Sequence, residues 1–202
     1  MHGAFLIAIA ALVASPALAA AIVPAHECRL EAWVVDRDPA GLNVRSAPSR
    51  EARLLGTLPP LVNPDGERDY GVELRITGAK DGWLRIEGAR DDPSRNGLGT
   101  PRPTYAGTGW ISGNLVRFGV QSAHGYAQPD VKSERRVDLG QDWLSDRAEI
   151  TRMLACKDDW AHVEFRLRAA TAAADALGEP QRAWFRGICA NQETTCDRAA
   201  VD

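Results

Sequence analysis

The sequence lacks the excess of basic residues that a protein binding nucleic acid or anionic lipid would need. Its 202 residues include 24 Lys and Arg against 27 Asp and Glu, a formal net charge of -3. Such a balance provides no basic footprint for nucleic acid or for anionic lipid. Nucleic-acid binding is therefore disfavoured.

Sequence motifs of catalysis are also missing. There is no Gly-x-Ser-x-Gly elbow, no phosphate-binding glycine loop and no His-Glu-x-x-His helix. Beyond the N-terminal region the histidines are His26, His124 and His162, far apart in sequence and without a nucleophile pattern beside them. The sequence thus predicts no catalytic residue and no cofactor, and favours a protein that is not an enzyme.

Two pairs of neighbouring carboxylates, Asp91-Asp92 and Asp158-Asp159, are the remaining candidates for acid–base chemistry. Adjacent carboxylates in turns are ordinarily solvated, so we expect both pairs at the surface. An enzyme with an unrecognised carboxylate site is the third and weakest of the functional interpretations.

Long hydrophobic runs are missing after the first residues. Residues 1–14 are apolar but too few to cross a bilayer comfortably, and Ser15-Pro-Ala17-Leu-Ala19 follows as a small-x-small cleavage pattern. This predicts a signal peptide over residues 1–19, although the region has no Lys or Arg; a membrane anchor or a buried helix is the alternative. We expect a periplasmic or secreted protein, with no membrane contact after cleavage.

Cysteine is scarce but even in number, and all four residues follow the predicted cleavage site. In an exported chain this favours two disulfides. Three pairings are open; the turn-rich segment between Cys189 and Cys196 favours joining those two, which leaves Cys28 with Cys156. A zinc site is the alternative, but no Cys-x-x-Cys or His pair has the required spacing, so no metal is predicted.

Short alternating segments separated by Gly, Pro and Asp predict a mainly β protein. In the first half, Leu42 and Val44 alternate with polar neighbours before a Ser-Ala-Pro-Ser turn. Two polar stretches, 61–71 and 87–107, are predicted as long loops. The predicted strands are 30–35, 42–45, 52–58, 72–77, 83–86 and 108–116.

The stretch Leu42-Asn-Val-Arg-Ser-Ala-Pro-Ser49 resembles the Leu-Asn-Val-Arg-Ser-Gly-Pro-Ser motif of bacterial Src-homology-3 (SH3b) domains, with Ala47 in place of the glycine. A Leu-Gly-Thr-Leu strand, an Asp-Gly-Trp hairpin and a Gly-Trp-Ile closing strand follow in the family's order. The resemblance covers roughly residues 30–118. It implies a small SH3-like β-barrel over residues 28–118.

The second half repeats part of the first. Residues 75–87 align with 152–164 without a gap, keeping the Arg, Lys-Asp, Trp and Glu positions, and Gly109-Trp-Ile-Ser-Gly113 matches Ala183-Trp-Phe-Arg-Gly187. This predicts a second, divergent SH3-like barrel over residues 122–198. An alanine-rich insertion, 168–180, is predicted as a short helix with Gly178 as its C-cap.

Aromatic side chains at the mouths of such barrels are the candidate ligand-binding residues. Tryptophan is more often a core residue than a ligand platform, so a packing role is the alternative for each of them. Tyr105, in a Pro- and Gly-rich loop, is the strongest single candidate, and Trp143 is equally ambiguous. The candidates are Tyr70, Trp83, Tyr105, Trp110, Tyr126, Trp160 and Trp184.

Because bacterial SH3 domains commonly accompany wall hydrolases, the resemblance implies targets in the cell wall or periplasm. The first functional hypothesis is an exported binding module that recognises peptidoglycan stem peptides or a periplasmic protein. The second is a periplasmic adaptor or inhibitor that grips a folded partner with its long loops, 87–107 and 168–181.

Overall fold

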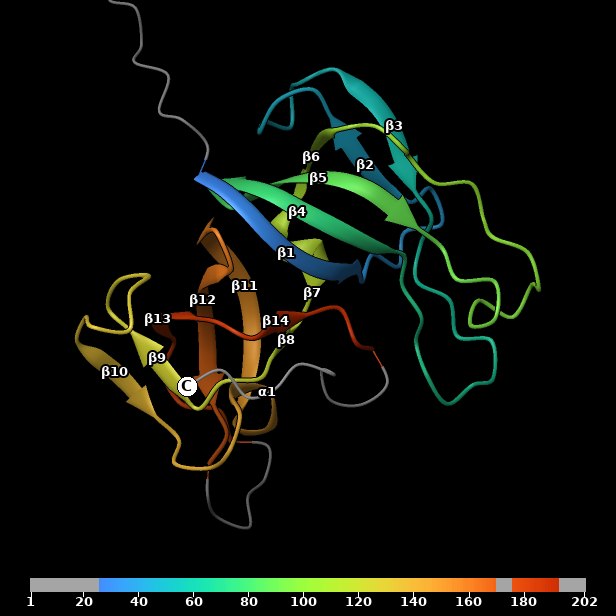
Figure 1. Ribbon diagram of the computed structural model, residues 1–202. Coiled ribbons are helices and arrows are strands. Elements are labelled where there is room, and N and C mark those ends of the chain that lie inside the picture. Colours follow the sequence, from blue (N-terminus) through green and yellow to red (C-terminus); the bar gives the residue numbers. More distant parts are fainter. Residues whose placement is uncertain (1–25, 170–175, 193–202) are drawn as a thin grey trace, which may run out of the picture.

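A computed structural model describes residues 26–169 and 176–192 (Figure 1), so the predicted signal peptide lies outside the described residues. The described chain is mainly β, and none of its helices is long and apolar enough to cross a membrane. Its elements are β1 (His26–Val34), β2 (Leu42–Arg45), β3 (Leu54–Leu58), β4 (Glu73–Lys80), β5 (Trp83–Arg90), β6 (Gly109–Ser112), the 3-10 helix η1 (Gly113–Leu115), β7 (Val116–Arg117), β8 (Gly119–Val120), β9 (His124–Tyr126), β10 (Arg135–Asp138), α1 (Leu144–Arg147), β11 (Ala148–Lys157), β12 (Trp160–Leu167), β13 (Gln181–Phe185) and β14 (Ile188–Cys189).

The first half forms a seven-stranded antiparallel sheet in the order β3-β2-β6-β5-β4-β1-β7. The predicted strands 42–45 and 83–86 are confirmed by β2 and within β5, and the predicted strand 72–77 is confirmed from Glu73 onward by β4. The sheet is open, so the predicted closed barrel is not seen. The physical reason lies in β1, which pairs with β4 and β7 and packs against the second half instead of closing the sheet onto β3.

The second half forms a five-stranded sheet in the order β10-β9-β13-β12-β11, which is likewise open. β8, which directly follows the first half, pairs with β14 from the C-terminal end of the described chain, and the two form a two-stranded antiparallel sheet. One hydrophobic core joins the sheets, because β11 packs against both β1 and β4 (Figure 1). The two halves are therefore packed together and not held apart by a linker.

The repeat seen in the sequence is confirmed in the hairpins β4–β5 and β11–β12. Lys80 pairs with Trp83 across the first turn, and Lys157 pairs with Trp160 across the second. Each hairpin then has a register shift at the same place, between Ile76 and Gly78 in the first and between Met153 and Ala155 in the second. Two segments with the same irregularity share a structure and not only a sequence pattern.

Both hairpin turns require a left-handed residue. Asp81 and Asp158 each have a φ of 52° at the first turn position. Asp tolerates this conformation better than most residues, and it suits the twist of a two-residue hairpin. The equal length of the two turns follows from this shared geometry.

Residues 170–175 of the alanine-rich insertion, 168–180, lie outside the described residues. At its described ends the backbone is not helical: Arg168 and Leu177 form an antiparallel bridge, and the Gly178 N–H donates to the carbonyl of Leu167 at 2.9 Å. Gly178 therefore continues a β ladder beyond β12 and does not cap a helix there.

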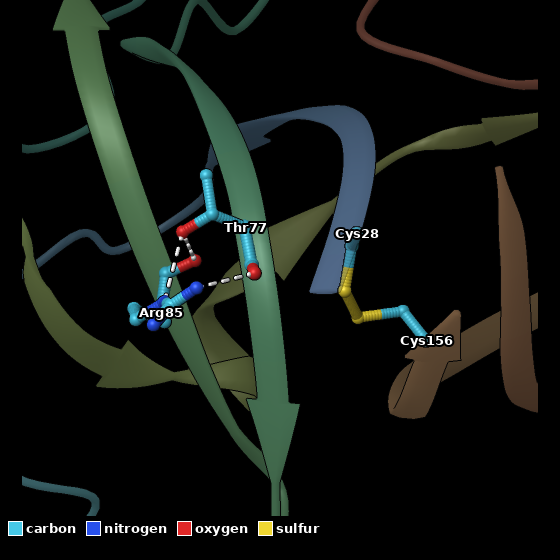
Figure 2. The surroundings of a disulfide bond; sticks show 4 residues. All are labelled: Cys28, Thr77, Arg85 and Cys156. Atoms are coloured by element: carbon cyan, nitrogen blue, oxygen red, sulfur yellow. Dashed lines mark hydrogen bonds between the residues drawn. A yellow bond between two sulfur atoms is a disulfide. The ribbon is translucent and has the colours of Figure 1, made fainter. Parts of the chain in front are cut away.

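A disulfide between Cys28 and Cys156 joins the two halves, as the pairing by elimination predicts (Figure 2). Cys28 lies in an irregular stretch of β1, where the register shifts between Glu27 and Leu30. That stretch also bonds the second hairpin turn, since Arg29 N–H donates to the Asp158 carbonyl at 2.7 Å and Asp158 N–H donates to the Glu27 carbonyl at 2.8 Å.

The predicted Cys189–Cys196 pair stays a prediction. Cys189 is disulfide-bonded and no described cysteine is free, but Cys196 lies outside the described residues. The disulfide that the structure does show indicates an oxidising, extracytoplasmic environment.

Candidate binding face on the five-stranded sheet

Strand β12 separates a buried side from an outward side by simple alternation. Ala161, Val163 and Phe165 are fully buried, whereas His162 and Glu164 lie between them on the opposite face and are half-buried. The neighbouring strand β13 follows the same pattern, with its apolar Ala183 and Phe185 inward. The outward side chains of both strands therefore share one face of the sheet.

Aromatic rings meet on this outward face. Trp184 is the cross-strand partner of both His162 and Tyr126. The His162 and Trp184 rings are stacked, with centroids 5.0 Å apart and planes inclined by 11°. Tyr126 and Trp160 meet edge to face at 5.6 Å and are buried, while Trp184 and His162 remain partly open to solvent. The stack is therefore the accessible part of the cluster.

Arginines from several strands border these rings. Glu164 accepts hydrogen bonds from Arg152 at 3.1 Å and from Arg182 at 2.7 Å, and the Arg186 guanidinium lies 5.2 Å from the Trp160 ring centroid. Burial of Glu164 acts to raise its pKa, but the hydrogen bonds from the two arginines outweigh it and hold the pKa below its usual value. Glu164 therefore stays ionised, and its two carboxylate oxygens already accept hydrogen bonds from the two arginines.

The His162 imidazole lies in a positive environment. Burial lowers the pKa of His162, and the charges of Arg182 and Arg136 lower it further. Since an unperturbed histidine titrates near pH ~6.5, His162 is neutral at neutral pH. We call the surface formed by Tyr126, Arg136, Trp160, His162, Arg182 and Trp184 the aromatic–arginine face.

The structure brings together three of the sequence-predicted candidates, Tyr126, Trp160 and Trp184, on this face. Trp83 and Trp110 lie on β5 and β6 of the other sheet, at positions equivalent to Trp160 and Trp184 in the repeat. There the partner of Trp110 is Arg85, which is turned back onto Thr77 by hydrogen bonds at 3.0 and 3.1 Å (Figure 2). Trp143 precedes α1 and is half-buried, away from these strands.

Tyr70 and Tyr105 are placed as packing residues of the first half. Tyr70 is 6% exposed, and the guanidinium of Arg95 lies 5.3 Å from its ring centroid. The side chain of Tyr105 lies against two glycines: a Cβ added to Gly56 would come within 2.7 Å of its ring, and one added to Gly107 within 2.6 Å of its hydroxyl oxygen. These glycines provide the space that the ring fills.

Replacing Gly56 by alanine is expected to lower the free energy of unfolding by about 1–3 kcal/mol, because the new methyl group must displace the Tyr105 ring. Urea denaturation of the variant measures this loss. The matched control is the same change in a Tyr105→Ala background, where it should cost far less. An equal cost in both backgrounds would show that the ring does not fill this space.

The predicted loop 87–107 is shorter at its start, because β5 runs on to Arg90. The observed loop, 91–108, is built around a buried carboxylate, which corrects the expectation that Asp91 is solvated. Asp91 is 6% exposed, and Arg102 donates to both of its oxygens, at 2.7 Å to Oδ1 and 3.1 Å to Oδ2. Asn96 is also buried and donates to Asp91 and to the Thr100 carbonyl. The neighbouring Asp92 lies closer to the expected surface position, because it is half-buried. Its carboxylate accepts a hydrogen bond from the Ser94 N–H in a turn.

His162, Arg136 and Arg182 belong to the face but were not among the sequence-predicted site residues. The alternation of β12 and the repeat, which aligns His162 with Arg85, were the available signals. Neither signal shows that the His162 and Trp184 rings stack, because the insertion between β12 and β13 separates the two residues in sequence.

Among residues 26–169 and 176–192, no group of three or more His, Cys, Asp and Glu side chains is placed to hold a metal ion. No family model matches the chain, and neither a curated protein nor a solved structure matches it. What the protein does must therefore be argued from its own site.

Proposed function

We propose that the protein is an exported, non-catalytic binding module whose aromatic–arginine face holds an extended, carboxylate-bearing peptide of the cell wall. The single observation that carries the proposal is the half-buried Trp184–His162 stack, with Arg182 two residues from Trp184 on the same face of β13. Flat, rigid rings give contact area at little cost in conformational entropy, and guanidinium groups match the planar geometry of a carboxylate.

Charge selects among the possible occupants of this face. Its cations exceed its carboxylates, because the one carboxylate of Glu164 is shared by Arg152 and Arg182, and β10 adds the exposed Arg136. A stem peptide is short and extended and offers free carboxylates, so it complements both the rings and the charges. The resemblance of residues 30–118 to bacterial SH3 domains and the disulfide, which suits an exported protein, support the same assignment.

The aromatic stack is expected to be the centre of binding. We predict that Trp184→Ala weakens co-sedimentation of the mature protein with purified sacculi by at least about tenfold, since removing a central aromatic residue commonly costs 2 kcal/mol or more. The matched control is Trp110→Ala, the equivalent residue of the first half, which should bind like the unchanged protein. Thermal unfolding of each variant confirms that it is folded.

Failure of the folded, unchanged protein to co-sediment with sacculi would overturn the wall-binding proposal. In that case crosslinking in intact cells tests the adaptor hypothesis, which requires a single stoichiometric protein partner. Equal loss of binding in the Trp110 and Trp184 variants would show that the five-stranded sheet is not the binding face.

A further inference from the structure

We infer that the tip of the loop 91–108 is a contact surface for a second copy of this chain, in a symmetric dimer in which Leu98 of each copy enters a hollow of the other. The surface belongs to the first half and is separate from the aromatic–arginine face, so the inference does not depend on the proposed function. Its evidence is an exposed apolar side chain on a braced loop, with a hollow of about 370 Å³ directly beside it.

The backbone on both sides of Leu98 presents this side chain to solvent. Leu98 is the most exposed large hydrophobic residue in the described part of the chain, at 63%. Its neighbours Gly97 and Gly99 have φ angles of 76° and 68°, which glycine adopts at no steric cost. The Leu98 N–H donates to Oδ1 of Asn96 at 2.8 Å. The loop therefore turns on both sides of Leu98 and carries it at its tip.

The tip is braced by buried polar groups beneath it. Asn96 is 3% exposed, and its amide donates to the carboxylate of Asp91, which Arg102 also holds. Arg102 in turn donates at 2.6 Å to the carbonyl of Pro60, in the loop 59–72 that joins β3 to β4. Because these bonds already fix the loop, little conformational entropy remains to be lost when Leu98 binds a partner.

The same two loops form the hollow beside the tip. Gly97 and Pro64 both line it and are in contact, since a Cβ added to Gly97 would lie 2.4 Å from the Cβ of Pro64. Tyr70 also lines it and is 6% exposed, and the Arg95 guanidinium lies 5.3 Å from its ring centroid. Pro64, the tyrosine ring and the arginine stem thus offer apolar contacts to a branched side chain such as leucine.

The leucine and the hollow adjoin on one surface, which favours a two-fold dimer. Gly97 lines the hollow and Leu98 follows it directly in the chain. A two-fold axis beside the tip can therefore bring each leucine to the hollow of the other copy at the same time. Such an interface is isologous, and it closes at two copies.

The charges of the hollow are also compatible with self-association. Its lining includes the carboxylates of Asp65 and Glu67 and the guanidinium groups of Arg68 and Arg95, which balance each other. A patch of one sign would repel its own copy, whereas a balanced patch can face itself with opposite charges opposed. Under the proposed function, a dimer would carry two aromatic–arginine faces, and binding through both would raise its affinity for a polymer.

Sedimentation equilibrium of the mature protein tests the dimer. We expect a monomer–dimer equilibrium with a dissociation constant between about 10 µM and 1 mM, because the surface is small. Leu98→Asp should weaken the association by at least about tenfold, since it removes the central apolar contact of the interface. The matched control is Val131→Asp, at an exposed valine in the turn between β9 and β10, which should associate like the unchanged protein.

A mixing experiment tests the symmetry. Ser94→Tyr places a large side chain at an exposed position that lines the hollow and keeps the main-chain bond from the Ser94 N–H to Asp92. Leu98→Asp and Ser94→Tyr should each associate poorly alone. In their equimolar mixture, the leucine of the Ser94→Tyr copy can enter the open hollow of the Leu98→Asp copy, so the mixture should associate more strongly than either variant.

Three results would overturn the dimer: the folded, unchanged protein stays monomeric up to about 1 mM, Leu98→Asp associates as strongly as the unchanged protein, or the mixture associates no more strongly than its components. Thermal unfolding of each variant verifies that it is folded. Loss of sacculus binding in a protein that still dimerises would reject the proposed function and leave this interface standing.

Discussion

Replacing Cys28 and Cys156 together by serine is expected to lower the free energy of unfolding by about 4 kcal/mol. The bond joins residues 128 positions apart, and for a loop of that length the chain-entropy model gives about 5 kcal/mol, with measured values commonly 2–5. Both cysteines are buried, so the serine hydroxyls add a small cost in the folded state. Guanidinium denaturation of the oxidised protein and the double variant measures the difference.

The matched control is the double serine variant at positions 189 and 196. If those residues are paired as predicted, their loop is much shorter, and the same model gives a loss of only about 2.5 kcal/mol. Reducing the unchanged protein should reproduce the sum of the two effects. A loss below about 1 kcal/mol for the Cys28 and Cys156 variant, at an unchanged denaturant dependence, would contradict the role of this bond as the main covalent brace.

The second large effect is expected at the buried ion pair of the loop 91–108. Asp91→Ala leaves the Arg102 guanidinium, whose side chain is 11% exposed, without its carboxylate partner. Removing one member of a buried pair commonly costs 3–5 kcal/mol, because the remaining charge is uncompensated. We expect a loss of about 3 kcal/mol in urea denaturation, and partial release of Pro60, whose carbonyl accepts from Arg102 at 2.6 Å.

Two further variants separate the effect of leaving a buried charge unpaired from the effect of removing a side chain. Asp92→Ala, one residue away at a half-buried turn position, should cost less than about 1 kcal/mol. Replacing the pair by apolar residues, Asp91→Leu with Arg102→Met, should recover much of the stability, since no unpaired charge then remains. If Asp91→Ala is no more costly than Asp92→Ala, the pair does not organise the loop.

The ion pair also predicts a pH dependence. Burial acts to raise the pKa of Asp91, but hydrogen bonds from Arg102 and Asn96 outweigh it and hold the pKa below its ordinary value. A carboxyl whose folded pKa is depressed contributes stability above its unfolded pKa of about 3.9, and that contribution is lost as the pH falls through the folded pKa. The stability difference between the unchanged protein and Asp91→Asn should therefore shrink in acid below about pH 4.

Local patterns predicted the local parts of this fold. Alternation and the Lys-Asp-x-Trp turns located the hairpins β4–β5 and β11–β12, because a two-residue turn and a period of two are fixed by neighbours in sequence. The same reasoning expected each hairpin to close its own barrel. That expectation failed at β1, whose position is set by contacts with β11, far along the chain, and no local pattern encodes such contacts.

The residues of the candidate face were identified from the sequence only in part, for the same reason. The sequence identified Trp184 and Trp160 as candidates by residue type, but burial depends on the partner strand. Trp160 is 8% exposed beneath Arg186, whereas Trp184 is half-exposed. Asp91 was misjudged because its partner Arg102 lies 11 residues further on in a loop without periodicity. A carboxylate's partner across a loop leaves no pattern that a single sequence reveals.

The irregular stretch of β1 around Cys28 also bears on how the chain acquires its covalent structure. In a chain that crosses a membrane N-terminus first, Cys28 emerges first and Cys156 is the next cysteine to follow. Oxidation in the order of emergence therefore yields the observed bond directly, without a disulfide isomerase. The β1 backbone can form its hydrogen bonds with the hairpin turn at Asp158 only after that turn has formed. The step that joins the two halves should therefore be slow and should come last.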